Sequence, residues 1–226
     1  PVEHTLIGTG VIKLSYETGG FVTTLNSGER IRSEIAVVAA PIRVSEAILK
    51  NSFPKIAANL QKIPTASSIV VLHGFEQGAI SRPLDAYGFV VPKHDPSRLR
   101  AATFVTSKFE KRAPGDALLI RTFLGGPEDP DVLELSDPEV AELSLKELSK
   151  VLGTMGPPLV SRVVRYRDRT PQVELGHAQI VSALEEASVM TPGLYVIGNG
   201  IKGVGIPECV REARQIAKEI AALLSR

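Results

Sequence analysis

The sequence has no tryptophan, only one cysteine, and only seven phenylalanines and four tyrosines among its 226 residues. A lone cysteine, Cys209, excludes an intrachain disulfide and a cysteine-based zinc cluster, and this fits a reducing cytoplasm. So few aromatic rings disfavour a base-stacking surface. The formal net charge is +1, so no overall field attracts an anionic polymer. We therefore expect no nucleic-acid partner.

Long apolar runs are missing too. No run approaches the roughly 18 residues of a membrane-spanning helix, so we expect a cytoplasmic protein, with a peripheral membrane contact left open. What is present is an ordinary globular composition, 43% hydrophobic and 23% charged, at a length of one to two domains. The chain begins at Pro1 within strand-like text, "HTLIGTGVIKLSY", which predicts a piece of a longer protein.

The first part of the chain reads as strands followed by a helix. "FVTTLNSGERIRSEIAVVAAP" predicts a hairpin that turns at residues 26–28 and then a buried strand, "IAVVAA". Residues 43–63 predict a helix that Pro54 interrupts.

The middle of the chain predicts an antiparallel sheet, because short β-rich runs alternate with turns; these runs are "SIVVLHGF", "YGFVVP", "RAATFVTS", "ALLIRTFL" and "RVVRYR". A helix is predicted in "SDPEVAELSLKELSKVLG", where Ser136 and Glu139 have the spacing of a capping box and Gly153 ends the helix. Another helix is predicted over residues 178–187. Together these patterns predict a mixed α/β (α+β) fold.

A glycine-rich loop, "GNGIKGVGIPEC", joins an apparent strand to the last helix. Glycines let a backbone approach a ligand closely, and the helix that Pro207 opens presents unpaired N–H groups and a partial positive charge. The loop is neither G-x-G-x-x-G nor a phosphate-binding Walker loop. It is equally consistent with a turn that only lets the helix pack tightly on the strand. The helix predicts one apolar stripe, formed by Val210, Ala213, Ile216, Ala217, Ile220 and Leu224.

The stretch "TPGLYVIGNGIKGVGIPECVREARQIAKEI" resembles the C-terminal flavin motif of the oxygen-dependent protoporphyrinogen and coproporphyrinogen oxidases, within the monoamine-oxidase-like FAD superfamily. Three further stretches agree in order: "RPLDAYGFVVP", "FLGGPEDPDVLELSDPEV" and "RYRDRTPQVELGH". The resemblance covers nearly the whole chain, which would be the C-terminal half of a family member. The N-terminal G-x-G-x-x-G unit that cradles the FAD pyrophosphate is not in this sequence.

The resemblance implies two domains. Residues 1–42 and 188–226 would form part of a Rossmann-like FAD-binding domain, and residues 43–187 an inserted substrate-binding domain. It also implies that the full protein oxidises a porphyrinogen of haem biosynthesis in three two-electron steps, with FAD as cofactor and O₂ as acceptor. The partners would be the porphyrinogen and the missing N-terminal half, without which we expect the fragment to be inactive; retention of FAD by the fragment alone is left open.

The resemblance further assigns residues to the cofactor and the substrate. The FAD-binding residues would be Val11, Ala39, Ala40, Pro41, Gly198, Asn199, Gly203, Val204, Gly205, Ile206 and Pro207. Gly88 and Phe89 would face the porphyrinogen, although core packing explains Phe89 equally well. No acid or base side chain is demanded, because the flavin carries the chemistry, and no catalytic residue is named.

Other candidate groups have simpler explanations. His4, His73, His94 and His177 are scattered without a metal-binding spacing, so no metal site is expected. Cys209 and His177 read as structural residues. Four arginines, Arg162, Arg165, Arg167 and Arg169, are predicted to share one strand face, where they would bind porphyrin propionates or simply meet solvent.

Two other interpretations stay open. One is a different amine-oxidase-like flavoprotein, such as an amine oxidase or a carotenoid desaturase, although the glycine loop offers no aromatic cage. The other is a binding module that has lost its cofactor.

Overall fold

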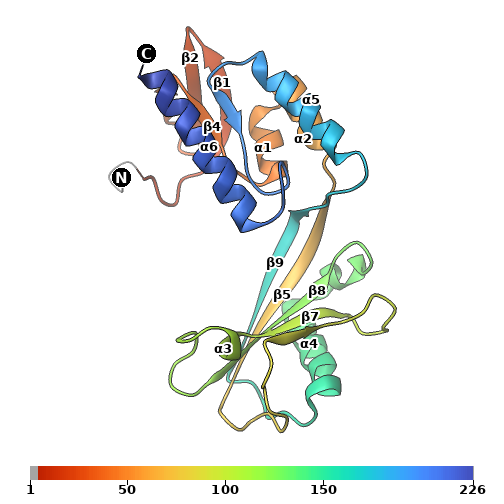
Figure 1. The fold of residues 1–226 in the computed structure, drawn as a ribbon. Helices are drawn as coiled ribbons and strands as arrows, with labels where there is room; N and C mark the ends of the chain where they lie inside the picture. The colour runs from red at the N-terminus through yellow and green to blue at the C-terminus, as the bar shows by residue number, and fades with distance from the viewer. Residues whose placement is uncertain (1–4, 226) are drawn as a thin grey trace. The chain divides into compact units, whose positions relative to one another are not determined.

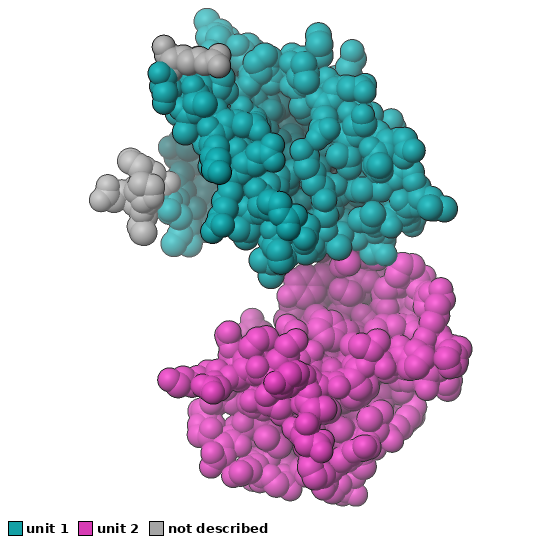
Figure 2. All heavy atoms as spheres, viewed as in Figure 1, with its two compact units in different colours: residues 1–65, 171–226 teal, residues 66–170 magenta. Residues whose placement is uncertain are grey.

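The structure, a computed structural model, describes residues 5–225 (Figure 1). His4 and the outermost residues of the predicted terminal segments therefore lie outside the described part. The chain divides into two compact units, coloured separately in Figure 2: unit 1 comprises residues 1–65 and 171–226, and unit 2 comprises residues 66–170. The mixed α/β class is confirmed.

The boundaries of these units differ from the predicted domain boundaries. Residues 43–65 and 171–187, which the sequence analysis placed with the inserted domain, belong to unit 1. The physical reason is packing, because Leu60 and Leu184 from these two segments are buried in the same apolar cluster as Phe21. The role of each unit in binding cofactor or substrate stays a prediction.

Unit 1 combines an antiparallel sheet in the order β1-β2-β3, a parallel pair formed by β10 and β4, and helices. Its strands are β1 (Val11–Glu17), β2 (Gly20–Leu25), β3 (Arg30–Ser33), β4 (Ala36–Val38) and β10 (Leu194–Val196). Its helices are α1 (Ile42–Leu49), α2 (Pro54–Gln61), α5 (His177–Val189) and α6 (Ile206–Leu224). Pro54 opens α2, as predicted, because a proline needs no N–H partner in the first helical turn.

Unit 2 contains a five-stranded sheet in the order β6-β7-β8-β5-β9. Its strands are β5 (Thr65–Phe75), β6 (Gly88–Val90), β7 (Leu99–Phe104), β8 (Leu118–Gly125) and β9 (Val160–Pro171), and β5 and β9 extend into unit 1 by one residue each. The β5–β8, β7–β8 and β6–β7 pairs are antiparallel, as predicted. Its helical elements are α3 (Val105–Lys108), the 3₁₀ helix η2 (Pro130–Glu134) and α4 (Asp137–Leu152).

Helix α4 begins and ends where the sequence predicts. The backbone N–H of Ser136 donates to the Glu139 carboxylate at 2.7 Å, and Gly153 follows the helix with φ 76°. Val140 and Leu148 are buried in the same cluster as Ile120 of the sheet, so α4 covers one face of it. No helix in residues 5–225 is long and apolar enough to cross a membrane.

A polar network lies inside this apolar layer. His73 is fully buried, with Nδ1 2.8 Å from the Ser161 hydroxyl and Nε2 2.9 Å from the Ser144 hydroxyl. The Ser144 hydroxyl also lies 2.7 Å from that of Thr122. Burial lowers the pKa of His73 from 6.5 to about 4, because an imidazolium would lose its hydration there. Neutral His73 of β5 is therefore hydrogen-bonded to β9 and α4 directly, and to β8 through the Ser144 hydroxyl.

This burial predicts a pH-dependent stability. The unfolded chain binds a proton at His73 near pH 6.5 and the folded chain only near pH 4, so the free energy of unfolding should fall as pH drops through this window. The full effect is about 3 kcal/mol. We expect urea unfolding curves at pH 7 and pH 4.5 to show most of this loss. His73→Gln, which keeps a neutral hydrogen-bonding side chain, should give a smaller difference between the two pH values; an equal difference would exclude His73 as the cause.

Candidate functional site

Two short parallel strands bring the segments of the candidate site together. Ala36 of β4 pairs with Leu194 of β10, and Val38 pairs with Val196. The chain then continues as residues 39–41 after β4 and as residues 198–205, the glycine loop, after β10. Both segments leave the same edge of the parallel pair, and the carboxyl ends of parallel strands are where α/β sheets bind ligands.

The first cavity at this edge, the loop cavity, has a volume of about 410 Å³. Its lining residues are Ala39, Ile197, Gly198, Asn199, Val204, Gly205, Ile206, Cys209, Val210 and Ala213. Six of them are among the eleven residues predicted to bind the cofactor, and none of the ten carries a charge or an aromatic ring. The cavity therefore suits a flat and largely apolar ring.

A second cavity, the strand cavity, has a volume of about 520 Å³ and is lined mainly by β4 and its neighbours. Val11, Ala39 and Ala40 line it, so Ala39 belongs to both cavities. The remaining predicted residues, Pro41, Gly203 and Pro207, line neither of these two cavities. The structure thus brings eight of the eleven predicted residues to two cavities that share one residue.

Hydrogen bonds hold the glycine loop in place. Within the loop, Gly200 N–H donates to the Gly203 carbonyl at 2.8 Å, and Ile201 N–H donates to the Gly198 carbonyl at 3.2 Å. From outside the loop, the Glu212 carboxylate accepts from Gly198 N–H at 3.0 Å. His177 Nε2 lies 2.9 Å from the Ile201 carbonyl, an acceptor, so Nε2 carries the proton. His177 thus anchors the loop through Nε2, whereas its buried Nδ1 has no hydrogen-bond partner among the described residues.

The glycines of the loop serve different purposes. Gly198 has φ 122°, and a Cβ on it would meet no atom within 4 Å, so its bare backbone borders open space. A Cβ on Gly205 would stand 2.2 Å from Glu208 Oε2, and one on Gly203 would stand 2.8 Å from Glu208 Cγ. Glu208 therefore fills space that we expected a ligand to use. Its carboxylate lies in the first turn of α6, where the positive end of the helix favours it.

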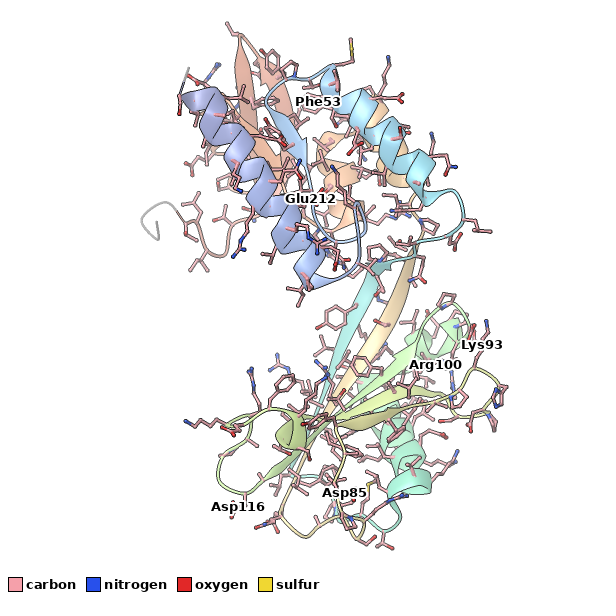
Figure 3. All side chains as sticks on the ribbon, in the orientation of Figure 1. Phe53, Asp85, Lys93, Arg100, Asp116 and Glu212 are labelled. Atoms are coloured by element: carbon pink, nitrogen blue, oxygen red, sulfur yellow. The ribbon has the colours of Figure 1, made fainter. Side chains whose placement is uncertain are left out.

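Glu212 is the residue that the sequence analysis missed. It is only 8% exposed, and it is the only buried residue of α6. A signal was available, because Glu212 stands between Cys209 and Ile216, on the side of the helix where the pattern places apolar residues, and a lone glutamate is seldom buried without a partner. The predicted apolar stripe itself is largely exposed, as Val210 (45%) and Leu224 (65%) show. Figure 3 labels Glu212 on α6.

The two predicted substrate residues lie in unit 2. Gly88 has φ 138°, and a Cβ on it would stand 2.0 Å from the Ala102 carbonyl oxygen, so glycine is required there by the neighbouring strand. Phe89 packs on Phe104 with ring centroids 6.2 Å apart and joins the core cluster. Core packing, the alternative left open by the sequence, therefore describes Phe89.

The prediction that four arginines share one strand face is wrong. Arg165 donates to the Leu133 and Leu135 carbonyls at 2.9 Å and 2.6 Å, and it forms an ion pair with Asp137 at 2.7 Å. It therefore anchors the segment that leads into α4. Arg162 precedes Arg165 by three positions, which in a strand places the two side chains on opposite faces.

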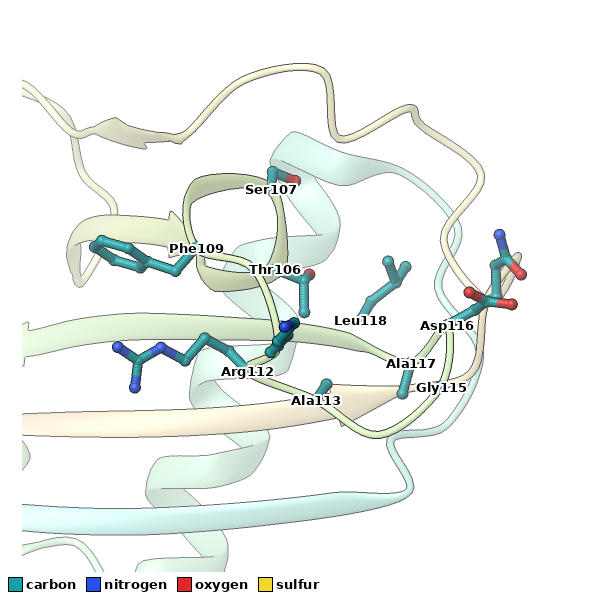
Figure 4. A pocket seen from close by; sticks show the side chains of 11 residues that line it. Thr106, Ser107, Phe109, Arg112, Ala113, Gly115, Asp116, Ala117 and Leu118 are labelled. Atoms are coloured by element: carbon teal, nitrogen blue, oxygen red, sulfur yellow. The ribbon is translucent and has the colours of Figure 1, made fainter.

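A further cavity of about 530 Å³ lies in unit 2 beside α3 (Figure 4). The side chains of Phe109 and Arg112 extend to one side of it, and Asp116 lies at the other end. None of the residues predicted from the sequence lines it. Within residues 5–225, no group of three acidic, histidine or cysteine side chains is placed to hold a metal ion.

Comparisons with known proteins identify a family for this chain. A family model described as flavin containing amine oxidoreductase matches residues 3–221. The chain is 28% identical to coproporphyrinogen III oxidase of Bacillus subtilis (strain 168), over 96% of this chain and 46% of that protein. It is 25% identical to the chloroplastic protoporphyrinogen oxidase of Nicotiana tabacum, over 93% of this chain and 41% of that protein. The chain thus spans less than half the length of these relatives.

Solved structures show the same architecture. A protein from Exiguobacterium sp. 255-15, provisionally assigned as a protoporphyrinogen oxidase, superposes with a TM-score of 0.77 and 26% identity, over 94% of this chain and 46% of that one. Reduced UDP-galactopyranose mutase superposes with a TM-score of 0.70 over 90% of this chain and 45% of that one. At 14% identity, the second likeness indicates the fold alone.

The contacts of the glycine loop predict which glycine is structurally essential. A Cβ on Gly200 (φ 90°) would stand 2.3 Å from both Cβ and Cγ of Pro171. Gly28 is a matched control, because it has φ 86° with nothing near its missing Cβ. We expect Gly28→Ala to lower the free energy of unfolding by about 1 kcal/mol through backbone strain alone, and Gly200→Ala by about 1 to 3 kcal/mol more through overlap. Equal losses in urea unfolding would contradict this packing.

Proposed function

Because the chain belongs to the flavin containing amine oxidoreductase family, we propose that it is the C-terminal part of an FAD-dependent porphyrinogen oxidase. The full protein would oxidise protoporphyrinogen IX or coproporphyrinogen III with O₂ as acceptor, in haem biosynthesis. The resemblance read from the four sequence motifs agrees with the relatives. The observation that carries the proposal is the loop cavity, where residues 198–206 and Ala39 meet beside the first turn of α6.

The fit of a flavin to this site is supported by the cavity lining. The apolar lining suits the flat faces of a ring, and the open space beside Gly198 lets a ring edge approach the backbone. The first turn of α6 supplies Ile206 and Cys209 to the lining and carries a partial positive charge, which the Glu208 carboxylate in the same turn partly offsets. We propose that Gly198, Asn199, Val204, Gly205 and Ile206 contact the ring. Val11, Ala39 and Ala40 would border the rest of the cofactor, with Pro41, Gly203 and Pro207 nearby.

The chain's own residues bind and orient, and FAD when bound supplies the hydride acceptor and the reaction with O₂. The Glu212 carboxylate fixes Gly198, and His177 fixes Ile201, so the backbone of the loop holds its shape beside the ring. The apolar lining keeps water away from the reacting face. No charged side chain lines the loop cavity, which fits a reaction in which the protein need not provide an acid or base.

We propose that the partner of unit 1 is the N-terminal half of the same protein, which would carry the phosphate-binding fingerprint. The relatives are more than twice as long as this chain. Ile206 is 81% exposed and Leu224 is 65% exposed on α6, and Val37 of β4 is 45% exposed. β4, which was predicted to be a buried strand, is therefore only partly buried by the described residues. Such exposed apolar side chains are expected where further strands and helices of the full protein pack against this surface. Unit 2 would carry most of the substrate surface, with Gly88 at one edge.

The activity can be tested directly on the full-length protein that contains this chain. We expect it to purify yellow, and its flavin absorbance near 450 nm to bleach when one of the two porphyrinogens is added without oxygen. Admitting air should restore the absorbance and release hydrogen peroxide. A flavoprotein that neither porphyrinogen reduces would disprove the substrate assignment, and a colourless protein that does not take up FAD would disprove the cofactor assignment.

The role of Glu212 can be tested by substitution in the same protein. Glu212→Ala leaves the Gly198 N–H without its acceptor, so we expect FAD to bind roughly tenfold more weakly, about the value of one hydrogen bond to a charged group. Glu212→Gln keeps an oxygen acceptor and should retain most of the affinity. The measurement is fluorescence titration of the apoprotein with FAD, and an alanine variant that binds FAD normally would contradict the proposed role.

A further inference from the structure

The five-stranded sheet of unit 2 has two different faces. Residues such as Ile69, Val71 and Ile120 point to the face that α4 covers. Alternation along the strands places their neighbours on the opposite face, which we name the open face. Its residues on β8, β5 and the edge strand β9 include Val70, Leu72, Arg121, Phe123, Val164 and Tyr166. None of them belongs to the core cluster, and Tyr166 remains 44% exposed.

The register of the sheet sets Arg121 in the middle of this apolar surface. Arg121 of β8 lies opposite Leu72 of β5 and opposite Thr103 of β7. Two residues further along the same strand, Phe123 lies opposite Val70. The guanidinium carbon of Arg121 stands 4.9 Å from the centroid of the Phe123 ring, so the cation is oriented by the aromatic ring beside it.

The Arg121 guanidinium lacks the acidic partner that Arg98 and Arg165 of unit 2 have. Its Nε is buried and has no hydrogen-bond acceptor, and no acidic residue among residues 5–225 forms an ion pair with it. Arg98, by contrast, is paired with Asp129 at 2.6 Å, and Arg165 with Asp137 at 2.7 Å. Only Nε among its nitrogens is buried without a partner, so the two terminal amino groups are the donors that an acceptor from outside the chain can reach.

We propose that Arg121 is a substrate-binding residue that holds a carboxylate of the porphyrinogen while the macrocycle lies on the open face. This inference rests on the proposed function. The aliphatic and aromatic side chains around Arg121 offer contact area to a flat apolar ring system, and the guanidinium offers planar, paired N–H groups that match a carboxylate. The apolar surroundings strengthen this charge-assisted pair, because they exclude the water that would screen it. Arg165 of β9 is less suited, since it already forms an ion pair with Asp137.

Binding of a stable porphyrin to the full-length protein separates the carboxylate contact from the ring contact. The probes are coproporphyrin III and its tetramethyl ester, which has the same ring without negative charge. Their dissociation constants are measured by fluorescence titration. We expect the wild-type protein to prefer the acid, and Arg121→Gln to weaken binding of the acid by about tenfold to a hundredfold while binding of the ester stays within twofold.

Two further variants serve as controls. Arg121→Lys keeps the charge but loses the planar paired donors, so it should give an intermediate loss for the acid. Arg167→Gln removes the same charge from the same sheet, but Arg167 is exposed and points to the side of η2, where it donates to the Leu133 carbonyl. It should bind both probes as the wild type does. Flavin content and thermal unfolding of each variant report whether it has folded.

The outcomes separate this inference from the proposed function. If the wild type oxidises a porphyrinogen but Arg121→Gln, correctly folded, binds the acid with unchanged affinity, Arg121 is not the carboxylate contact and only this inference is lost. If Arg121→Gln does not fold, Arg121→Lys takes its place. If Arg121→Lys then prefers the acid over the ester as strongly as the wild type does, Arg121 is not the carboxylate contact and only this inference is lost. If the wild type neither binds coproporphyrin III nor oxidises either porphyrinogen, the proposed function fails and the inference fails with it.

Discussion

The candidate site depends on the pairing of two three-residue strands from distant parts of the chain. β4 and β10 are joined by parallel pairing, extended by the hydrogen bonds from Ala36 N–H to the Gly193 carbonyl and from Ile197 N–H to the Val38 carbonyl. Because the strands run in the same direction, the residues that follow them emerge at one edge, and Ala39 lies next to the glycine loop. Without this pairing, Ala39 would not lie opposite the glycine loop, and the loop cavity would not form.

Buried polar groups are satisfied to different degrees in different parts of the protein. In unit 2, His73 and the hydroxyls of Ser144, Ser161 and Thr122 satisfy one another inside the sheet and helix layer, so the network contributes to stability alone. On the opposite face of the same sheet, Arg121 has an unsatisfied buried N–H. In unit 1, the buried carboxylate of Glu212 is satisfied, but by a loop backbone rather than by a side chain.

Local signals predicted much of the fold. Pro54, the Ser136 and Glu139 capping box, and Gly153 act through backbone geometry within a few residues, and the structure has each helix boundary where they place it. Contacts between distant residues were harder to predict. Nothing local reveals that Arg165 reaches the carbonyl groups of Leu133 and Leu135 before α4. The unit boundaries differ from the predicted domain boundaries for the same reason, since the helices of residues 43–65 and 171–187 pack with unit 1 through tertiary contacts.

The hydrogen bonds of the glycine loop have a consequence for association. Glycine has the largest conformational freedom of any residue, and a free glycine-rich segment loses much entropy when a ligand orders it. Here Glu212, His177 and the bonds within the loop have already restricted the backbone. The loop therefore loses this entropy when the protein folds and not when a ligand binds. Ligand binding then carries a smaller entropic cost, which raises the affinity.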